Sequence, residues 1–507
     1  MTKRYAFLAF CVVALALFFG LHSAVLGANQ GGTAHGEQGA NLAIAQGFVN
    51  NGFDFFHAET PAYNYQNGEY DVNQSSSSRI TAAHFPIHAF VPAVIHSLSG
   101  AQLTEVVQWY NILWGFVGLF FLYLLALRVT NHIGKSLFIF VFMASAPIFT
   151  FYQSNFLPEI PALSCVIIGT YYLYQFHISN ELKKGYSALL WMLVGVLTSP
   201  NLVLFMIGAT VLIVNRPVFS KYVDLRKILF ISLIYLPVLL SLIFFYSQKE
   251  EYGSQFAGFL QDWVYDQSVS NSIWDSWKLH YFTVFQTVVG AIVLLVLGYQ
   301  AFRKRVTVAW KNDPFLRFSL FAVLAVGVAI LNPYQVIYSD VYFLKLLLLP
   351  FVLIAIFIVD RLNIDWMYRY PKMSVGGLLL LLLIMLSEGN WTQNVRNELN
   401  RTSQGKNLAF TFRGGDELLK KHGVKPFDPL AVAIPKNWGI GQEVLQHLNH
   451  NGTIRQMPNA GELVPRFPKG QYVVAHIDER PYLYDRFKTR FKELGDNGSI
   501  VLYRAID

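Results

Sequence analysis

The sequence predicts an α-helical polytopic membrane protein with about eleven transmembrane helices and a small soluble α/β domain at its C-terminal end. Of the 507 residues, 54% are hydrophobic and only 14% are charged, whereas roughly 25% are charged in an average soluble protein. The hydrophobic residues come in runs of about twenty, the length that crosses a hydrocarbon core. Lys and Arg gather in every second connection between these runs, which is typical of cytoplasmic loops.

Nine apolar runs are candidate spans. The first could instead be a cleaved signal peptide, because Lys3 and Arg4 precede it and small residues follow it. It is longer than the apolar core of about 7–15 residues in a signal peptide, so we expect it to be retained. The spans are 5–27, 108–128, 136–152, 159–178, 228–247, 281–300, 316–333, 342–360 and 373–388.

The basic residues orient the chain in the membrane. Up to residue 390 there are 22 Lys and Arg, and 18 of them lie in alternate short connections. These connections are predicted to be cytoplasmic, together with the N-terminus. The net charge of +8 is then a consequence of topology, and no nucleic-acid partner is expected. Because Arg504 to Asp507 contain no endoplasmic-reticulum retrieval signal, we expect a bacterial inner membrane.

Segment 187–215 is apolar and has basic residues on both sides, so it must cross the membrane an even number of times. Its 29 residues make two half-length helices of about 21 Å each at 1.5 Å per residue. The break is expected at 198–201, because Pro200 disfavours helix in the residue before it. This hairpin raises the count to eleven spans and places the C-terminal domain outside, on the periplasmic side.

The first outer loop, residues 28–107, is too long for a simple connector and is predicted to be functional. Two amphipathic stretches, near 39–50 and 86–98, show apolar residues at helical spacing. We expect both to form interfacial helices along the outer membrane surface.

Residues 391–507 are predicted to form the extracytoplasmic α/β domain, and residues 1–390 the transmembrane domain. Short apolar strands are expected at 430–434, 472–475 and 499–503, with a helix over 440–448. A glycine pair follows the first strand, but Val444 stands where the dinucleotide-binding fingerprint needs glycine.

Two acidic residues on the predicted outer face are candidates for chemistry. Glu37 lies just after the first span, in Glu-Gln-Gly-Ala, and Glu159 lies at the outer mouth of the fourth span, between Pro158 and Pro161. Proline and an acid at the start of a helix also have an ordinary structural explanation. Residue type alone therefore leaves open whether Glu159 takes part in chemistry or only starts the helix.

The order of these features resembles the GT-C superfamily of polyprenyl-phosphate-sugar-dependent glycosyltransferases, particularly the protein O-mannosyltransferase and lipid A aminoarabinose transferase branch. Glu37-Gln38 stands where that branch has Asp-Glu, so both positions depart from the family while the first keeps its carboxylate. His84 and Pro86 stand where the branch has a basic residue and paired prolines. The Tyr- and Leu-rich run 338–350 ends in proline as the family's run does. The resemblance covers roughly residues 1–390.

The resemblance implies an inverting glycosyltransferase that moves a sugar from a polyprenyl-phosphate donor to a hydroxyl of a lipid, glycan or protein acceptor on the outer face. Glu37 would be the general base, since shielding at the interface raises the pKa of a carboxylate and makes it a better base. Glu159 would position the acceptor or support the wall of the site. The sequence does not identify the sugar or the acceptor.

Positively charged groups would bind the donor phosphate and stabilise the charge that develops there. Lys345 has two further explanations, because a lysine near the end of a span can extend to the membrane surface or pair with an acid such as Asp340. The residues predicted to bind substrate are Arg79, His84, His88, Asp340, Tyr342 and Lys345.

Three alternatives stay open. His84, His88 and Glu37 could together ligate a divalent metal, although the sequence otherwise predicts no cofactor and no metal. A transporter or flippase for lipid-linked sugars would use a broken element such as 187–215. A non-enzymatic envelope protein could use the spans as an anchor, but eleven spans exceed what an anchor needs.

Overall fold

The computed structural model divides the chain into two compact units. The helical unit comprises residues 1–28, 108–240 and 261–397, and the second unit comprises 29–107, 241–260 and 398–507. The residues that the structure describes are 3–23, 26, 35–62, 65–66, 69–70, 85–216, 219, 225–252, 281–303, 313–331, 340–363, 371–402, 411–425, 428–435, 443–457, 467–479 and 490–506.

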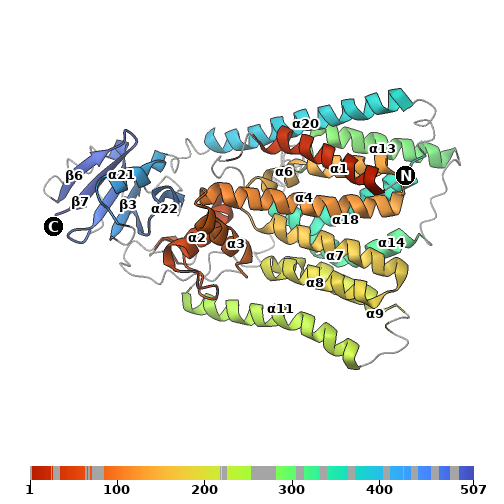
Figure 1. The fold of residues 1–507 in the computed structure, drawn as a ribbon, viewed down its shortest axis with the longest axis horizontal. Helices are drawn as coiled ribbons and strands as arrows, with labels where there is room; N and C mark the ends of the chain where they lie inside the picture. The colour runs from red at the N-terminus through yellow and green to blue at the C-terminus, as the bar shows by residue number, and fades with distance from the viewer. Residues whose placement is uncertain are drawn as a thin grey trace. The chain divides into compact units, whose positions relative to one another are not determined.

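The helical unit is a bundle of mostly long helices (Figure 1). Three of its helices, α4, α11 and α20, continue into the second unit. The main elements are α1 (Lys3–Leu17), α4 (Leu103–Thr130), α5 (Ile133–Ala144), α6 (Pro147–Gln153), α7 (Glu159–Ser179), α8 (Leu182–Thr198), α9 (Val203–Val214), α11 (Leu225–Tyr252), α13 (Val284–Phe302), α14 (Pro314–Ser319), α15 (Val323–Leu331), α17 (Asp340–Tyr342), α18 (Leu348–Arg361) and α20 (Pro371–Thr402).

Within the described ranges, six helical stretches are long and apolar enough to cross a membrane, or seven if α5 and α6, bent by 66°, form one span. The six are Arg4–His22, Leu103–Thr130, Leu225–Phe244, Val284–Phe302, Pro314–Leu331 and Phe343–Arg361. Helix α7 does not pass this test, and most of its side chains are buried against other parts of the protein. The predicted total of about eleven spans therefore stays a prediction.

The predicted break in segment 187–215 is confirmed. Helix α8 ends at Thr198, Ser199 is extended (φ −129°, ψ 92°), and Pro200 opens a 3₁₀ turn that leads into α9. A Cβ atom on Gly185, near the start of α8, would lie 3.4 Å from the side chain of Ile213 at the end of α9. The two helices therefore run antiparallel as a hairpin, although α8 begins earlier than predicted, at Leu182.

The helix ends that flank the predicted cytoplasmic connections lie at one end of the helical unit, the right-hand end in Figure 1. Lys135 Nζ, from the start of α5, donates to the carbonyl of Asp360 at 2.7 Å. Gln300, near the end of α13, donates to the carbonyl of Asn363 at 3.0 Å and accepts from its amide at 2.9 Å. Basic segments far apart in the sequence thus lie together, and we call this the basic end.

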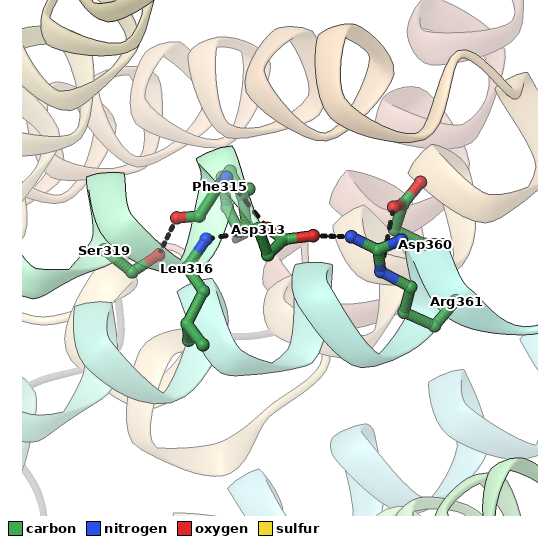
Figure 2. A network of polar contacts seen from close by, with 6 residues as sticks. All are labelled: Asp313, Phe315, Leu316, Ser319, Asp360 and Arg361. Atoms are coloured by element: carbon green, nitrogen blue, oxygen red, sulfur yellow. Dashed lines mark hydrogen bonds and ion pairs between the residues drawn. The ribbon is translucent and has the colours of Figure 1, made fainter. Parts of the chain in front are cut away.

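A buried acid holds two elements together at the basic end (Figure 2). The Asp313 carboxylate accepts hydrogen bonds of 2.9 Å from the amides of Phe315 and Leu316, which caps the first turn of α14. The same carboxylate forms an ion pair with Arg361, the last residue of α18. Arg361 also lies 3.8 Å from Asp360.

The second unit contains both helices predicted in the first outer loop, as α2 (His35–Asn51) and α3 (Ile87–Ser99). They pack through aromatic rings, with the Phe48 and Phe90 centroids 5.2 Å apart. Small residues make most of the buried face of α3, whereas Leu98, from the predicted apolar stripe, is 84% exposed. Their expected position along the outer membrane surface stays a prediction.

The C-terminal residues of this unit form a five-stranded sheet in the order β4-β3-β5-β7-β6. Strand β3 pairs in parallel with β4 and β5, and β7 pairs antiparallel with β5 and β6. The three predicted strands are confirmed as β3, β5 and β7, and the predicted helix as α22, whose described residues begin at Glu443. The elements are α21 (Gly415–Lys421), β3 (Leu430–Pro435), α22 (Glu443–Leu448), β4 (Thr453–Met457), β5 (Tyr472–His476), β6 (Phe491–Asp496) and β7 (Ile500–Ala505).

The first outer loop is part of the core of this unit. Ala62 lies in the hydrophobic cluster that covers one face of the sheet, and the Gly452 amide donates to the Pro61 carbonyl at 2.9 Å. The Gln46 side chain, from α2, donates to Asn449 at 2.8 Å. The sequence analysis did not predict this association between the loop and the C-terminal residues.

Candidate active site

Glu159 is placed by a buried turn that precedes α7. The Asn111 side chain, on α4, donates to the carbonyls of Asn155 and Leu157 at 2.7 and 3.0 Å. Pro158 then starts the helix, and Glu159 is its first residue. Because the turn is fixed from a neighbouring helix, the Glu159 carboxylate has a defined position, and its side chain is only 10% exposed.

Lys345 lies opposite this carboxylate. Its Nζ is 3.0 Å from Glu159 Oε1, and its side chain is 14% exposed. Lys345 belongs to a π-helical turn, Phe343–Leu347, that precedes α18, and turns of this kind inside α-helices are frequent at functional sites. The ammonium also lies 5.7 Å from the centroid of the Tyr342 ring.

The contact settles one question that the sequence left open. Of the alternatives considered for Lys345, pairing with an acid is observed. The observed partner is Glu159, whereas the sequence suggested Asp340 as an example. An extended side chain that reaches the membrane surface is not observed, because the carboxylate of Glu159 holds the ammonium inside the unit. Two charges shielded from water must be paired, since removing one partner of such a pair costs about 3–5 kcal/mol.

The second oxygen of the same carboxylate is also shielded. Glu159 Oε2 is buried and has no hydrogen-bond partner among the residues that the structure describes. A buried acceptor without a donor is unfavourable by about 1–3 kcal/mol. A ligand hydroxyl that reached this oxygen would remove that penalty, so the site is suited to bind a polar ligand.

Other predicted site residues are placed only in part. Glu37 lies in the first turn of α2 and Asp340 begins α17, but their side chains are outside the described residues, as are Arg79 and His84 entirely. The structure therefore brings together Glu159, Lys345 and Tyr342, and leaves the other assignments as predictions.

His88 belongs to the second unit and is buried on α3. Burial lowers the pKa of its imidazole from 6.5 to about 3, because an apolar environment disfavours the charged form. At neutral pH His88 would therefore offer a hydrogen-bonding group and no positive charge to a ligand.

A metal site is not seen in the described part of the chain, where no three His, Cys, Asp or Glu residues come together. The predicted alternative involves His84 and the side chain of Glu37, which lie outside that part, so it stays untested.

Asn111 is the site residue that the sequence analysis missed. It is a polar residue in a strongly apolar helix, α4, and it is buried. That contrast is a signal in the sequence, because a polar side chain inside a span usually binds to something in the protein.

Solved structures of related fold match almost the whole chain, and a family model matches part of it. The family model of dolichyl-phosphate-mannose-protein mannosyltransferases matches residues 83–245. ArnT from Cupriavidus metallidurans in the apo state superposes with a TM-score of 0.60 at 13% identity, covering 98% of this chain and 97% of ArnT. ArnT bound to undecaprenyl phosphate gives 0.58 at 14% identity, covering 99% and 98%.

A third solved structure is larger. The arabinofuranosyltransferase AftD from Mycobacteria superposes with a TM-score of 0.54 at 12% identity, covering 100% of this chain and 42% of AftD. No curated protein matches the sequence. The apolar helices and the ArnT-like fold identify an integral, multi-pass membrane protein. The predicted resemblance is therefore confirmed: this chain has the fold of the GT-C membrane glycosyltransferases, of the type seen in ArnT.

Proposed function

We propose that this protein is an inverting membrane glycosyltransferase that moves a sugar from a polyprenyl-phosphate donor to an acceptor hydroxyl on the outer face of the membrane. The fold shared with ArnT, which has been solved with undecaprenyl phosphate bound, supports a donor of this class. The observation that carries the proposal is the Glu159–Lys345 pair, which fixes a cation at the predicted outer end of the helical unit.

Lys345 is the proposed contact of the donor phosphate. The charge on the phosphate rises as the bond to the sugar breaks, and a cation already in position stabilises that charge without further reorganisation. The contact with Glu159 holds the ammonium in place. Arg79 and His84 are proposed as further phosphate contacts, with Tyr342 and Asp340 beside Lys345.

Glu37 is the proposed general base, on the resemblance to the family. The acceptor oxygen attacks the anomeric carbon, its proton passes to the Glu37 carboxylate, and the bond from the sugar to the phosphate oxygen breaks. Polyprenyl phosphate leaves from the opposite face of the sugar, so the anomeric configuration inverts. We assign to Glu159 Oε2 the role of accepting a hydrogen bond from the acceptor, because this oxygen is buried and has no hydrogen-bond partner among the described residues.

The base assignment is tested with the full-length protein in nanodiscs, a labelled donor lipid and a crude acceptor fraction. Glu37→Gln removes the base and keeps the size of the side chain. Transfer should fall by about 10²–10⁴ while donor binding persists. Glu105→Gln, an equivalent change at another predicted outer acid, is the matched control and should transfer normally. Full transfer by Glu37→Gln would eliminate Glu37 and leave Asp54, Glu59 or Glu159 to be tested as the base.

The role of Lys345 requires a separate experiment, because breaking a buried ion pair also destabilises the protein. Lys345→Met should lower the melting temperature, and the double variant Glu159→Gln/Lys345→Met should recover much of it. If Lys345 contacts the phosphate, donor binding stays weak in the double variant. Recovery of donor binding together with stability would show that the pair is structural only.

A transporter would instead move the lipid without forming a glycosidic bond.

A further inference from the structure

The basic end of the helical unit contains a cavity that the proposed reaction does not use. Its volume is about 750 Å³, and it lies between α9 and the segment from α14 to α15. His177, on its wall, is 18 residues after Glu159 on the same helix, or about 27 Å along the axis at 1.5 Å per residue. The cavity is therefore separate from the candidate active site.

Its position follows from a close approach of two elements. A Cβ atom on Gly208, in α9, would lie only 1.9 Å from the carbonyl oxygen of Phe321. The backbones of α9 and of the turn Leu320–Ala322 therefore touch at this point. Gly208 and Phe321 both line the cavity, which opens beside the contact.

One part of the lining is cationic. Arg216 follows the end of α9, and Arg317 lies in the last turn of α14. Arg216 Nη2 contacts the imidazole ring of His177, nearest to Nδ1, so these two side chains lie against each other. No acidic residue is among the described residues that line the cavity. The nearby Asp313 is already engaged, because it caps α14 and pairs with Arg361 (Figure 2).

The rest of the lining is apolar and reaches the protein surface. Leu320 and Val323 are 61% and 54% exposed, and Val211 and Leu324 are also exposed. In a membrane-spanning bundle such side chains face hydrocarbon, so the cavity is accessible from the bilayer. A ligand that satisfies the whole lining must combine an anionic head with apolar chains.

We propose that this cavity binds one anionic phospholipid from the leaflet at the basic end. Its phosphate lies between the guanidinium groups of Arg216 and Arg317, which suit phosphate because they offer paired N–H donors. Its acyl chains lie along Val211, Leu320 and Val323. Basic pockets between membrane helices are a recurrent way to bind such headgroups, and this site is a lipid site distinct from that of the donor.

The test is native mass spectrometry of the full-length protein with dioleoyl phosphatidylglycerol, and with dioleoyl phosphatidylcholine as the neutral lipid of the same chain length. One phosphatidylglycerol should be retained in preference to phosphatidylcholine. Arg216→Gln and Arg317→Gln should each weaken retention about tenfold or more, since each removes a charge-assisted contact. Arg303→Gln, at the end of α13 and away from the lining, is the matched control and should bind normally.

A second variant guards against misfolding of the arginine variants. Val323→Trp keeps both arginines and fills the apolar part of the cavity, so it should reduce retention while the protein stays monodisperse. Equal retention by the wild type and by Arg216→Gln/Arg317→Gln would overturn the proposal, as would equal binding of the two lipids. Displacement of phosphatidylglycerol by millimolar inorganic phosphate would overturn the lipid assignment and identify a site for free phosphate.

Discussion

Glu159, Lys345 and Asp313 each place an ionisable group where little water reaches it, and each is paired with a group of opposite charge. The sequence identified Glu159 as a candidate because it lies at the outer mouth of the fourth predicted span, and Lys345 because a lysine inside a span is unusual in itself. It could not show that they pair, since 186 positions separate them (345 − 159) and only the packing of α7 against the turn before α18 brings them together. The sequence analysis gave Asp313 no role, although an Asp directly before Pro314 is a local signal for the start of a helix. Its ion pair with Arg361 could not be predicted, because that contact depends on where α18 ends.

The burial of His88 leads to a prediction at the residue scale. Its pKa is about 3 in the folded protein and 6.5 in the unfolded chain, so the unfolded chain binds the proton first on acidification. The stability due to the neutral imidazole is complete above about pH 6.5 and falls by about 1.4 kcal/mol per pH unit below it. His88→Gln should flatten this dependence in denaturant unfolding followed by tryptophan fluorescence at pH 7.5, 6.5 and 5.5.

Ser97→Ala changes an exposed side chain of the same helix that does not titrate, and it is the control for that experiment. It should keep the pH dependence of the wild type. Identical slopes for the wild type and His88→Gln would mean that another group causes the loss of stability at low pH.

At the scale of elements, the sequence predicted those helices and strands whose signal lies in their own residues. Pro200 separates α8 from α9 by a local backbone effect that can be read from the sequence. The apolar strands β3, β5 and β7 can likewise be recognised from their own residues. Strands β4 and β6 were missed because each lies at an edge of the sheet and carries polar residues, as in Thr-Ile-Arg-Gln-Met. Edge strands are often polar because this prevents pairing with other chains.

The contact of Gly208 with Phe321 gives a prediction at this scale. Gly208→Ala places a methyl group against a backbone carbonyl, so α9 must shift and the protein should lose about 1–3 kcal/mol of stability. Gly290→Ala is the matched control in α13, where a Cβ atom meets nothing within 4 Å, and the higher helix propensity of alanine should stabilise by up to about 1 kcal/mol. Thermal melting monitored by size-exclusion chromatography distinguishes the two variants. Equal melting midpoints for Gly208→Ala and Gly290→Ala would contradict the close approach of α9 to Phe321.

At the scale of the whole molecule, the alternation of basic connections predicted which helix ends lie together, and the contacts of Lys135 and Gln300 at the basic end agree with it. The sequence could not predict that residues 61–62 belong to the core of the second unit, because nothing in a short loop segment indicates a partner almost 400 residues away. Which side of the membrane the basic end faces stays a prediction.

Cysteine labelling tests that orientation. In a parent with Cys11→Ser and Cys165→Ser, a cysteine at Glu181 should react with a membrane-impermeant maleimide only after permeabilisation of the cells. A cysteine at Asp416 should react in intact spheroplasts. The basic connections should be inside because cytoplasmic loops are enriched in Lys and Arg. Labelling of position 181 from outside would reverse the topology and place the proposed reaction on the opposite face.

The pairing of Gln46 with Asn449, 403 positions apart, also determines when the protein can finish folding. Ribosomes add about 5–20 residues per second, so roughly 20–80 s separate the synthesis of the two partners. During that interval α2 and residues 61–62 have been made, but the sheet that covers them does not yet exist. The second unit therefore closes only after the last strands are synthesised, and its first segment must stay protected from proteolysis and aggregation while the helices between them are inserted.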